Sequence, residues 1–303
     1  KEPKSNWIET DDFIKGKSVK LDGDKLNGNA FYLELYRNTE NWKSFFSFKN
    51  ISPNYQSDVG FLVKNNRRWT TFFHSYQNYL NKKALQFFSI GSKADIVYTF
   101  ENSLKTISLD GIITLRTILG SLIEYTYDWD IYKIYLGEEY NNLGKNEIEI
   151  TSSPNEFFSF MMNMSFGKDI AYNEDIPEVG KEFTLYFSPS FQINNNLNIE
   201  PSIRYARLKK LNDNSNFFKG YISRLSFKYQ FNKSLNIRLI SEYNNFYEQF
   251  FLQPLIQWNP NPSTIFYIGG NQGSIEDFNS EFSSPYRIDR TQYFLKFQYL
   301  IGL

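Results

Sequence analysis

The single histidine of the chain, His74, is the first residue whose side chain could support catalysis. It lies in the stretch FFHSYQNYL, beside Ser75 and close to Asn78. A Ser-His-Asn set on the outside of a β-barrel is used by outer-membrane phospholipases, so the stretch raises the hypothesis of a hydrolase. Neighbouring residues of one strand point to opposite faces, however, so His74 and Ser75 cannot pair as base and nucleophile within a regular strand. We therefore predict a structural histidine and no catalytic residues.

A calcium loop is suggested by LDGDKLNGN, from Leu21 to Asn29. An EF-hand needs acidic or amide groups at its first, third and fifth positions, Gly at the sixth and Glu at the twelfth. Counted from Asp22, the fifth position is Leu26 and the twelfth is Leu33. The pattern fails, and a polar turn is predicted. No cysteine is present, so thiolate metal sites are excluded, and one histidine excludes multi-histidine sites. The sequence predicts neither a metal nor a cofactor.

Two acidic stretches, AYNEDIPEVGKE and SIEDFNSEF, could bind divalent cations or bridge to lipopolysaccharide through them. Their spacing fixes no ligand geometry, so solvated outer loops are the simpler interpretation. Aromatic residues in the second stretch and after it, Phe278, Phe282 and Tyr286, could stack on sugars.

The elements that would position these residues are strands with one apolar and one polar side. The chain ends in RTQYFLKFQYLIGL, and side chains alternate across a strand. The same alternation recurs at 183–193, 197–205, 221–231 and 235–244. Weaker strands are predicted at 28–38, 42–51, 67–80, 85–99, 104–117, 119–131, 145–153 and 156–167. With roughly 14–16 strands, the sequence predicts an all-β, antiparallel, meandering sheet, and bacterial single-chain barrels usually have an even number of strands.

The connections are predicted to alternate in length. Polar turns near Asn194, Lys233 and Asn259 are tight, whereas GKDIAYNEDIPEVGK and LKKLNDNSN are long links. Short turns at one end and long loops at the other are typical of a transmembrane barrel. The reversal near NNFYEQ is short where a long link is expected.

Strand length and side-chain chemistry favour lipid over a protein core as the environment of the apolar side. Strands of ~10–14 residues exceed the ~5–6 of soluble proteins and suit the ~9–11 of a tilted membrane strand. Aromatic residues, which form girdles at membrane interfaces, gather near strand ends, as at Trp258. We therefore predict a transmembrane β-barrel. Its lipid-facing residues are predicted to include Phe183, Leu185, Phe187, Phe191, Leu225, Phe227, Tyr293, Leu295 and Phe297. Its lumen-facing residues are predicted to include Arg204, Arg224, Lys228, Arg238, Glu242 and Lys296.

The composition of the chain limits its partners and the kind of membrane segment it can contain. The formal net charge is +0, with a sequence pI near 6.9, so the basic excess typical of nucleic-acid partners is absent. No stretch approaches the ~18 apolar residues of a membrane helix. The opening KEPKSNWIET has no signal-peptide pattern and is expected to be a mature terminus or a cut within a longer protein. We expect 1–27 to be an N-terminal loop, plug or upstream strand, and 28–303 to be the barrel.

Several stretches carry a resemblance to a known family. They are NISPNYQSDVGFL (50–62), YQFNKSLNIRLISEYN (229–244), PLIQWNPNPSTIFYIGGN (254–271) and YFLKFQYLIGL (293–303). Together they resemble the uncharacterised outer-membrane barrels of the Bacteroidota, many of which carry an N-terminal domain similar to a family-nine carbohydrate-binding module. The chain departs from that family because it lacks the module and much of the upstream barrel sequence. It therefore resembles a short relative, or the C-terminal part of a longer protein. The resemblance implies a bacterial outer-membrane location and no established activity.

Three classes of function remain open. The first is a non-enzymatic subunit or scaffold of an outer-membrane complex, whose partners would be outer-membrane lipid, lipopolysaccharide and other subunits, and not nucleic acid. The second is a channel or transporter for small solutes or glycans, which predicts an open, charged lumen. The third is an outer-membrane hydrolase, which predicts His74 within hydrogen-bond reach of a serine hydroxyl.

Overall fold

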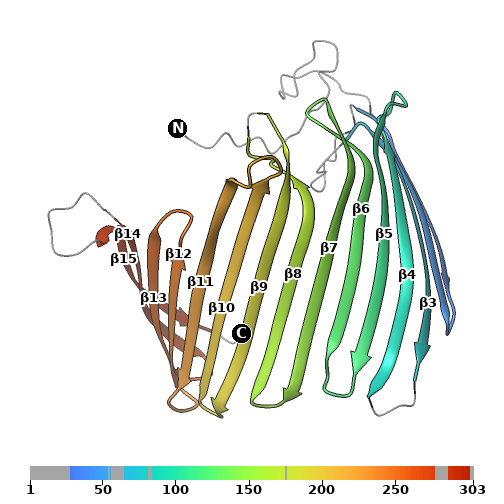
Figure 1. Ribbon diagram of the computed structural model, residues 1–303. Coiled ribbons are helices and arrows are strands. Elements are labelled where there is room, and N and C mark those ends of the chain that lie inside the picture. Colours follow the sequence, from blue (N-terminus) through green and yellow to red (C-terminus); the bar gives the residue numbers. More distant parts are fainter. Residues whose placement is uncertain are drawn as a thin grey trace. The chain divides into compact units, whose positions relative to one another are not determined.

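The fold is one antiparallel sheet of 15 strands, paired in the order of the sequence without a crossover. Figure 1 shows the strands following one another along the sheet, coloured from blue to red. The predicted all-β meander and the predicted strand number are confirmed. The strands are β1 Ala30–Asn38, β2 Trp42–Ile51, β3 Arg67–Tyr79, β4 Leu85–Tyr98, β5 Leu104–Thr117, β6 Leu122–Tyr135, β7 Glu138–Asn155, β8 Phe158–Ile170, β9 Val179–Asn194, β10 Leu197–Lys210, β11 Asn216–Gln230, β12 Leu235–Asn244, β13 Gln249–Asn261, β14 Thr264–Glu276 and β15 Tyr286–Tyr299.

The structure is a computed structural model. It describes residues 28–53, 55, 65–80, 84–174, 176–276 and 286–300. No helix in this part of the chain is long and apolar enough to cross a membrane.

The chain divides into two compact units. Unit 1 comprises Lys1–Leu115 with Tyr125–Asn146, and unit 2 comprises Arg116–Glu124 with Glu147–Leu303. Within unit 1, β1 to β4 pair in succession, and within unit 2 the succession runs from β8 to β15.

Asparagine side chains define the tight turns, as their positions predict. The Asn194 carboxamide oxygen accepts hydrogen bonds from the backbone amides of Asn196 and Leu197. Asn232 does the same for Ser234 and Leu235. Such Asx turns satisfy the backbone donors that the end of a strand leaves without a ladder partner. The local sequence therefore fixes where these hairpins reverse, and with it the pairing of the strands.

The β6–β7 hairpin differs from the prediction. Sequence alternation placed strands at 119–131 and 145–153, whereas the hairpin reverses at Leu136 and Gly137, with φ values of 49° and 86°. Positive φ at both central residues is typical of the type I′ turns that join antiparallel strands most tightly. The start of β7 was not predicted because its sequence, EEYNNLGKNE, is mostly charged and amide residues, which interrupt the alternation of apolar and polar side chains.

The links also differ from the prediction. β8 extends to Ile170 and β9 begins at Val179, so much of the predicted long link belongs to strands. The link 99–103, on the side predicted to carry long loops, is short as well, and the link 245–248 is short, as its sequence predicts. The predicted contrast in length between the links at one end of the strands and those at the other therefore holds only in part.

β1 and β15 are the first and last strands of the pairing order. β1 pairs with β2, and β15 pairs with β14. The pairing of first with last strand that would close a barrel is not among those of the described strands.

Candidate functional site

In unit 2, the six residues predicted to face a lumen lie on one face of the sheet. Directly opposed residues of antiparallel strands share a face. Arg224 lies opposite Glu242, and Lys228 lies opposite Arg238. Successive opposed pairs continue this face from β11 across β12, β13 and β14 to Lys296 on β15. We call this side the polar face of unit 2; it carries Arg204, Arg224, Lys228, Arg238, Glu242 and Lys296.

The nine residues predicted to face lipid lie on the opposite side, the apolar face. Phe187 on β9 lies opposite Ile203, and Phe297 on β15 lies opposite Phe266. Leu225 shares this face, since it lies opposite Pro201. The apolar face therefore carries Phe183, Leu185, Phe187, Phe191, Leu225, Phe227, Tyr293, Leu295 and Phe297.

A row of aromatic rings crosses the apolar face from β13 to β15. Trp258 stacks on Phe266 at a centroid distance of 5.2 Å, and Phe266 contacts Phe297 at 5.0 Å. Trp258 is 48% exposed and Phe297 58%. This row lies toward the tight turns of β11–β12 and β13–β14, where an interfacial girdle of a membrane barrel would lie.

Burial is inverted with respect to a water-soluble protein. The polar faces of both units bury hydroxyl, amide and carboxylate side chains, whereas the apolar faces leave large hydrophobic side chains exposed. Leu295 is 74% exposed and Ile90, in unit 1, 54%. Among the described residues, the buried hydrophobic side chains are Tyr140, Leu143, Ile170, Ala171, Leu208 and Ile240. Buried polar side chains of the polar faces include Ser47, Thr71, Ser75, Gln77, Asp95, Ser165 and Ser226.

A hollow of about 590 Å³ opens on the polar face of β9 to β12. Its lining includes Ile240 and Ser226, which are both buried. Five of the six predicted lumen residues line it, and Lys296 lies outside it. The full lining is Tyr186, Ser188, Glu200, Ser202, Arg204, Ile222, Arg224, Ser226, Lys228, Arg238, Ile240 and Glu242.

Two ion pairs join lining residues of the hollow on neighbouring strands. Lys228 Nζ lies 2.7 Å from Glu200 Oε2, and Arg224 Nη1 lies 3.4 Å from Glu242 Oε2. All four side chains are substantially exposed, so each pair contributes little to stability, about 0–1 kcal/mol. Their main effect is to hold two of the cations in place along the wall.

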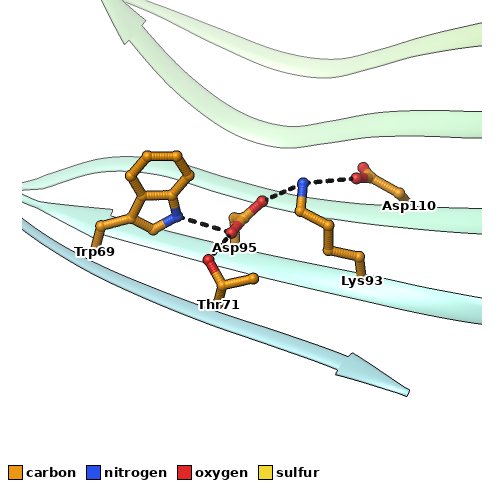
Figure 2. Close-up of polar contacts among 5 residues, drawn as sticks. All are labelled: Trp69, Thr71, Lys93, Asp95 and Asp110. Carbon is orange, nitrogen blue, oxygen red and sulfur yellow. Dashed lines mark hydrogen bonds and ion pairs between the residues drawn. The ribbon is translucent and has the colours of Figure 1, made fainter. Parts of the chain in front are cut away.

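Unit 1 carries a denser ionic cluster on its polar face. Figure 2 shows the Lys93 ammonium between the carboxylates of Asp95 and Asp110, at 2.7 and 3.2 Å. Asp95 also accepts hydrogen bonds from the Trp69 indole, at 2.7 Å, and from the Thr71 hydroxyl. The Asp95 and Asp110 side chains are only 8% and 13% exposed. Lys93 therefore compensates two carboxylates that are largely withdrawn from water.

A further carboxylate, that of Asp128, lies near the Lys93 cluster. Asp128 on β6 interacts electrostatically with Asp110 and Lys145. Within the described residues, no group of three or more histidine, cysteine, aspartate or glutamate side chains is arranged to hold a metal ion.

His74 lies on the apolar face of unit 1. Its Nδ1 is 2.9 Å from the Ser44 hydroxyl oxygen, and its ring stacks on Trp42 at 5.1 Å. Ser75 points to the opposite face, as predicted from the strand. The Ser44–His74 contact is the one that the hydrolase hypothesis requires. Asn78, four residues further along the strand, is about 13 Å away along the chain and cannot orient the ring. Among the described residues, the ring has no further hydrogen-bond partner that could complete a catalytic set.

The remaining candidate features are only partly described. Most of LDGDKLNGN, most of SIEDFNSEF, Phe278, Phe282, the Tyr286 side chain and the last residues, Ile301 and Leu303, lie outside the described residues.

Sequence reasoning missed the Lys93 cluster and the Ser44–His74 pair. Lys93 and Asp95 show the alternate spacing of residues on one face, but their partners come from neighbouring strands. Their contact depends on register, which a single sequence shows only where turns are well marked.

No protein-family model matches the chain, and no curated protein sequence matches it. The resemblance to outer-membrane barrels of the Bacteroidota therefore stays a prediction.

Proposed function

We propose that the chain forms an integral outer-membrane β-barrel protein with no catalytic role. The observation that carries the proposal is the inverted burial within each unit; in unit 1, for example, Ile90 is exposed on one face and Asp95 is buried on the other. A water-soluble sheet of this size would cover its apolar face with a second layer. Lipid provides that cover for a membrane barrel, whose lumen takes the polar side chains.

Strand lengths support the same proposal. The described strands run from 9 residues in β1 to 18 in β7. A tilted strand needs ~9–11 residues to cross the hydrocarbon core. The sheet can therefore span a bilayer along its whole width.

Closure of the barrel requires a further strand in this proposal. β1 and β15 are both odd-numbered strands of an antiparallel meander, so they run in the same direction. Direct pairing between them would be parallel, whereas bacterial barrels are antiparallel with an even number of strands. A sixteenth strand between β1 and β15, from outside the described residues or from another chain, would close the sheet and satisfy both edges in lipid.

The role we favour for this barrel is that of a subunit or scaffold in an outer-membrane complex, in contact with lipid and lipopolysaccharide. A second role, a channel for small solutes, is favoured by the hollow that Arg224, Arg238 and Glu242 line on the polar face.

Reconstitution tests the proposal. Protein refolded into vesicles is expected to float with the lipid in a density gradient and to stay bound after alkaline carbonate washing. Release of the protein from the vesicles into the carbonate wash would contradict membrane integration. Measurement of ion conductance across planar bilayers, together with identification of proteins that co-purify from native membranes, then separates the two roles. A channel is expected to conduct ions after purification, whereas a scaffold is expected to show no conductance and to retain partner proteins.

A further inference from the structure

The hollow on the polar face of unit 2 has two cationic residues at directly opposed positions of neighbouring strands. Lys228 and Arg238 lie directly opposite each other on β11 and β12. Like charges in directly opposed positions destabilise a sheet unless an anion compensates them. Glu200, at 2.7 Å from Lys228, engages the lysine. Arg238 has no hydrogen bond or ion pair to any described residue, and its other opposed neighbour, on β13, is Leu255.

A second arginine of the hollow, Arg204, also has no carboxylate partner among the residues that the structure describes. The Arg204 guanidinium lies 5.2 Å from the ring centroid of Tyr186. Stacking on an aromatic face leaves the N–H groups at the edge of a guanidinium free to donate. Arg204 and Arg238 are both exposed, and both belong to the lining of the hollow.

The hollow therefore holds a local surplus of positive charge. Four of its lining residues are cationic, namely Arg204, Arg224, Lys228 and Arg238, and two are carboxylates, namely Glu200 and Glu242. The surplus is two positive charges, in a chain whose formal net charge is +0. Concave surfaces with one sign of charge focus the electric field and concentrate counter-ions.

The other lining groups fit a bound oxyanion. Ser188, Ser202 and Ser226 are small, and each hydroxyl can donate a hydrogen bond. The volume of about 590 Å³ falls within the range of small-molecule sites, ~300–1,000 Å³. It leaves room for an organic group beside the anion.

We propose that this hollow binds a small solute carrying a phosphate monoester. A phosphate dianion matches the surplus of two positive charges, and its oxygens match the planar donor pairs of Arg204 and Arg238. The inference rests on the proposed function in one respect, that the polar face is open to water. It does not require the membrane location, because all lining residues belong to unit 2.

Calorimetric titration tests the proposal. Inorganic phosphate and glucose 6-phosphate are titrated into the full chain, folded in a non-ionic detergent at low ionic strength, with glucose as the uncharged comparison. We expect saturable binding of both phosphates and none of glucose. Arg238→Gln and Arg204→Gln are each expected to weaken binding at least tenfold, because each removes one guanidinium.

Arg290→Gln is the matched control. Arg290 lies on the polar face, opposite Gly273, and outside the hollow. Its removal is expected to leave phosphate binding unchanged, and Arg238→Lys is expected to retain part of it. Heat-modifiable gel migration verifies that each variant is folded.

Three results would overturn the proposal. One is the absence of saturable phosphate binding by the folded wild-type chain. Another is an equal loss in Arg290→Gln, which would indicate diffuse attraction by the whole polar face. The third is binding of succinate as tightly as phosphate, which would indicate a site for carboxylate ligands and not for phosphate. None of these results bears on membrane integration, which the vesicle experiment measures separately.

Discussion

Leu295→Arg is expected to impair insertion, whereas Lys296→Gln is expected to be tolerated. Leu295 lies opposite Ile268 on the apolar face and is 74% exposed, so in a bilayer its side chain would contact lipid. An arginine on the lipid face near the middle of the membrane costs ~2–4 kcal/mol, and the cost falls toward zero near the interfaces. Lys296 points to the polar face, where its ammonium lies 5.7 Å from the Tyr267 ring centroid.

The two substitutions form a matched pair because they are adjacent in β15 and change one charge each. Heat-modifiable gel migration of protein refolded into vesicles gives the folded fraction of each variant. Equal tolerance of the two substitutions would show that the assignment of the faces is wrong.

Lys93→Met is expected to destabilise unit 1 strongly. The substitution leaves Asp95 and Asp110 without the cation between them, although both carboxylates are largely buried. Removing one partner from a fully buried ion pair costs about 3–5 kcal/mol. Lys93 is 38% exposed, and water compensates part of the loss, so we expect about 2–3 kcal/mol. Urea unfolding of the protein in detergent micelles, followed by tryptophan fluorescence, measures the change, and Trp69 reports from within the cluster.

Lys228→Met is the control for this substitution. Its pair with Glu200 is exposed, with side-chain exposures of 49% and 35%, and is expected to contribute less than about 1 kcal/mol. Adding Asp95→Asn to Lys93→Met should restore part of the lost stability, because the amide carries no uncompensated charge. A Lys93→Met variant as stable as Lys228→Met would contradict the role assigned to Lys93.

The sequence predicted which residues share a face because the side-chain period of a strand is two. Arg224 and Leu225 were assigned to opposite faces on that basis, and the register of β11 with β12 confirms that they lie on opposite faces. The hairpins at Asn194 and Asn232 were predictable for a related reason, since asparagine side chains form turns through local hydrogen bonds.

The contacts between strands could not be predicted in the same way. Ser44 meets His74, and Lys93 meets Asp110, only because their strands pair in a particular register. Strand register depends on the connecting turns, and a turn such as Leu136-Gly137, between β6 and β7, has positive φ at a leucine, which has no clear mark in the sequence. The local surplus of positive charge in the hollow cannot be recognised in the sequence either. Arg204 and Arg238 are far apart in sequence, and they line one hollow because β11 pairs with the strands of both.

Cysteine labelling of the adjacent residues Arg224 and Leu225 tests the central claim most directly. The chain has no native cysteine, so Arg224→Cys and Leu225→Cys each carry one thiol. After reconstitution into vesicles, a charged, membrane-impermeant maleimide is expected to label Arg224→Cys and to leave Leu225→Cys unlabelled until the bilayer is dissolved and the protein unfolded. Leu225 is 44% exposed in the sheet, so the sheet itself does not protect a thiol at this position, whereas lipid on the apolar face would. Rapid labelling of Leu225→Cys in intact vesicles would contradict a membrane-embedded barrel.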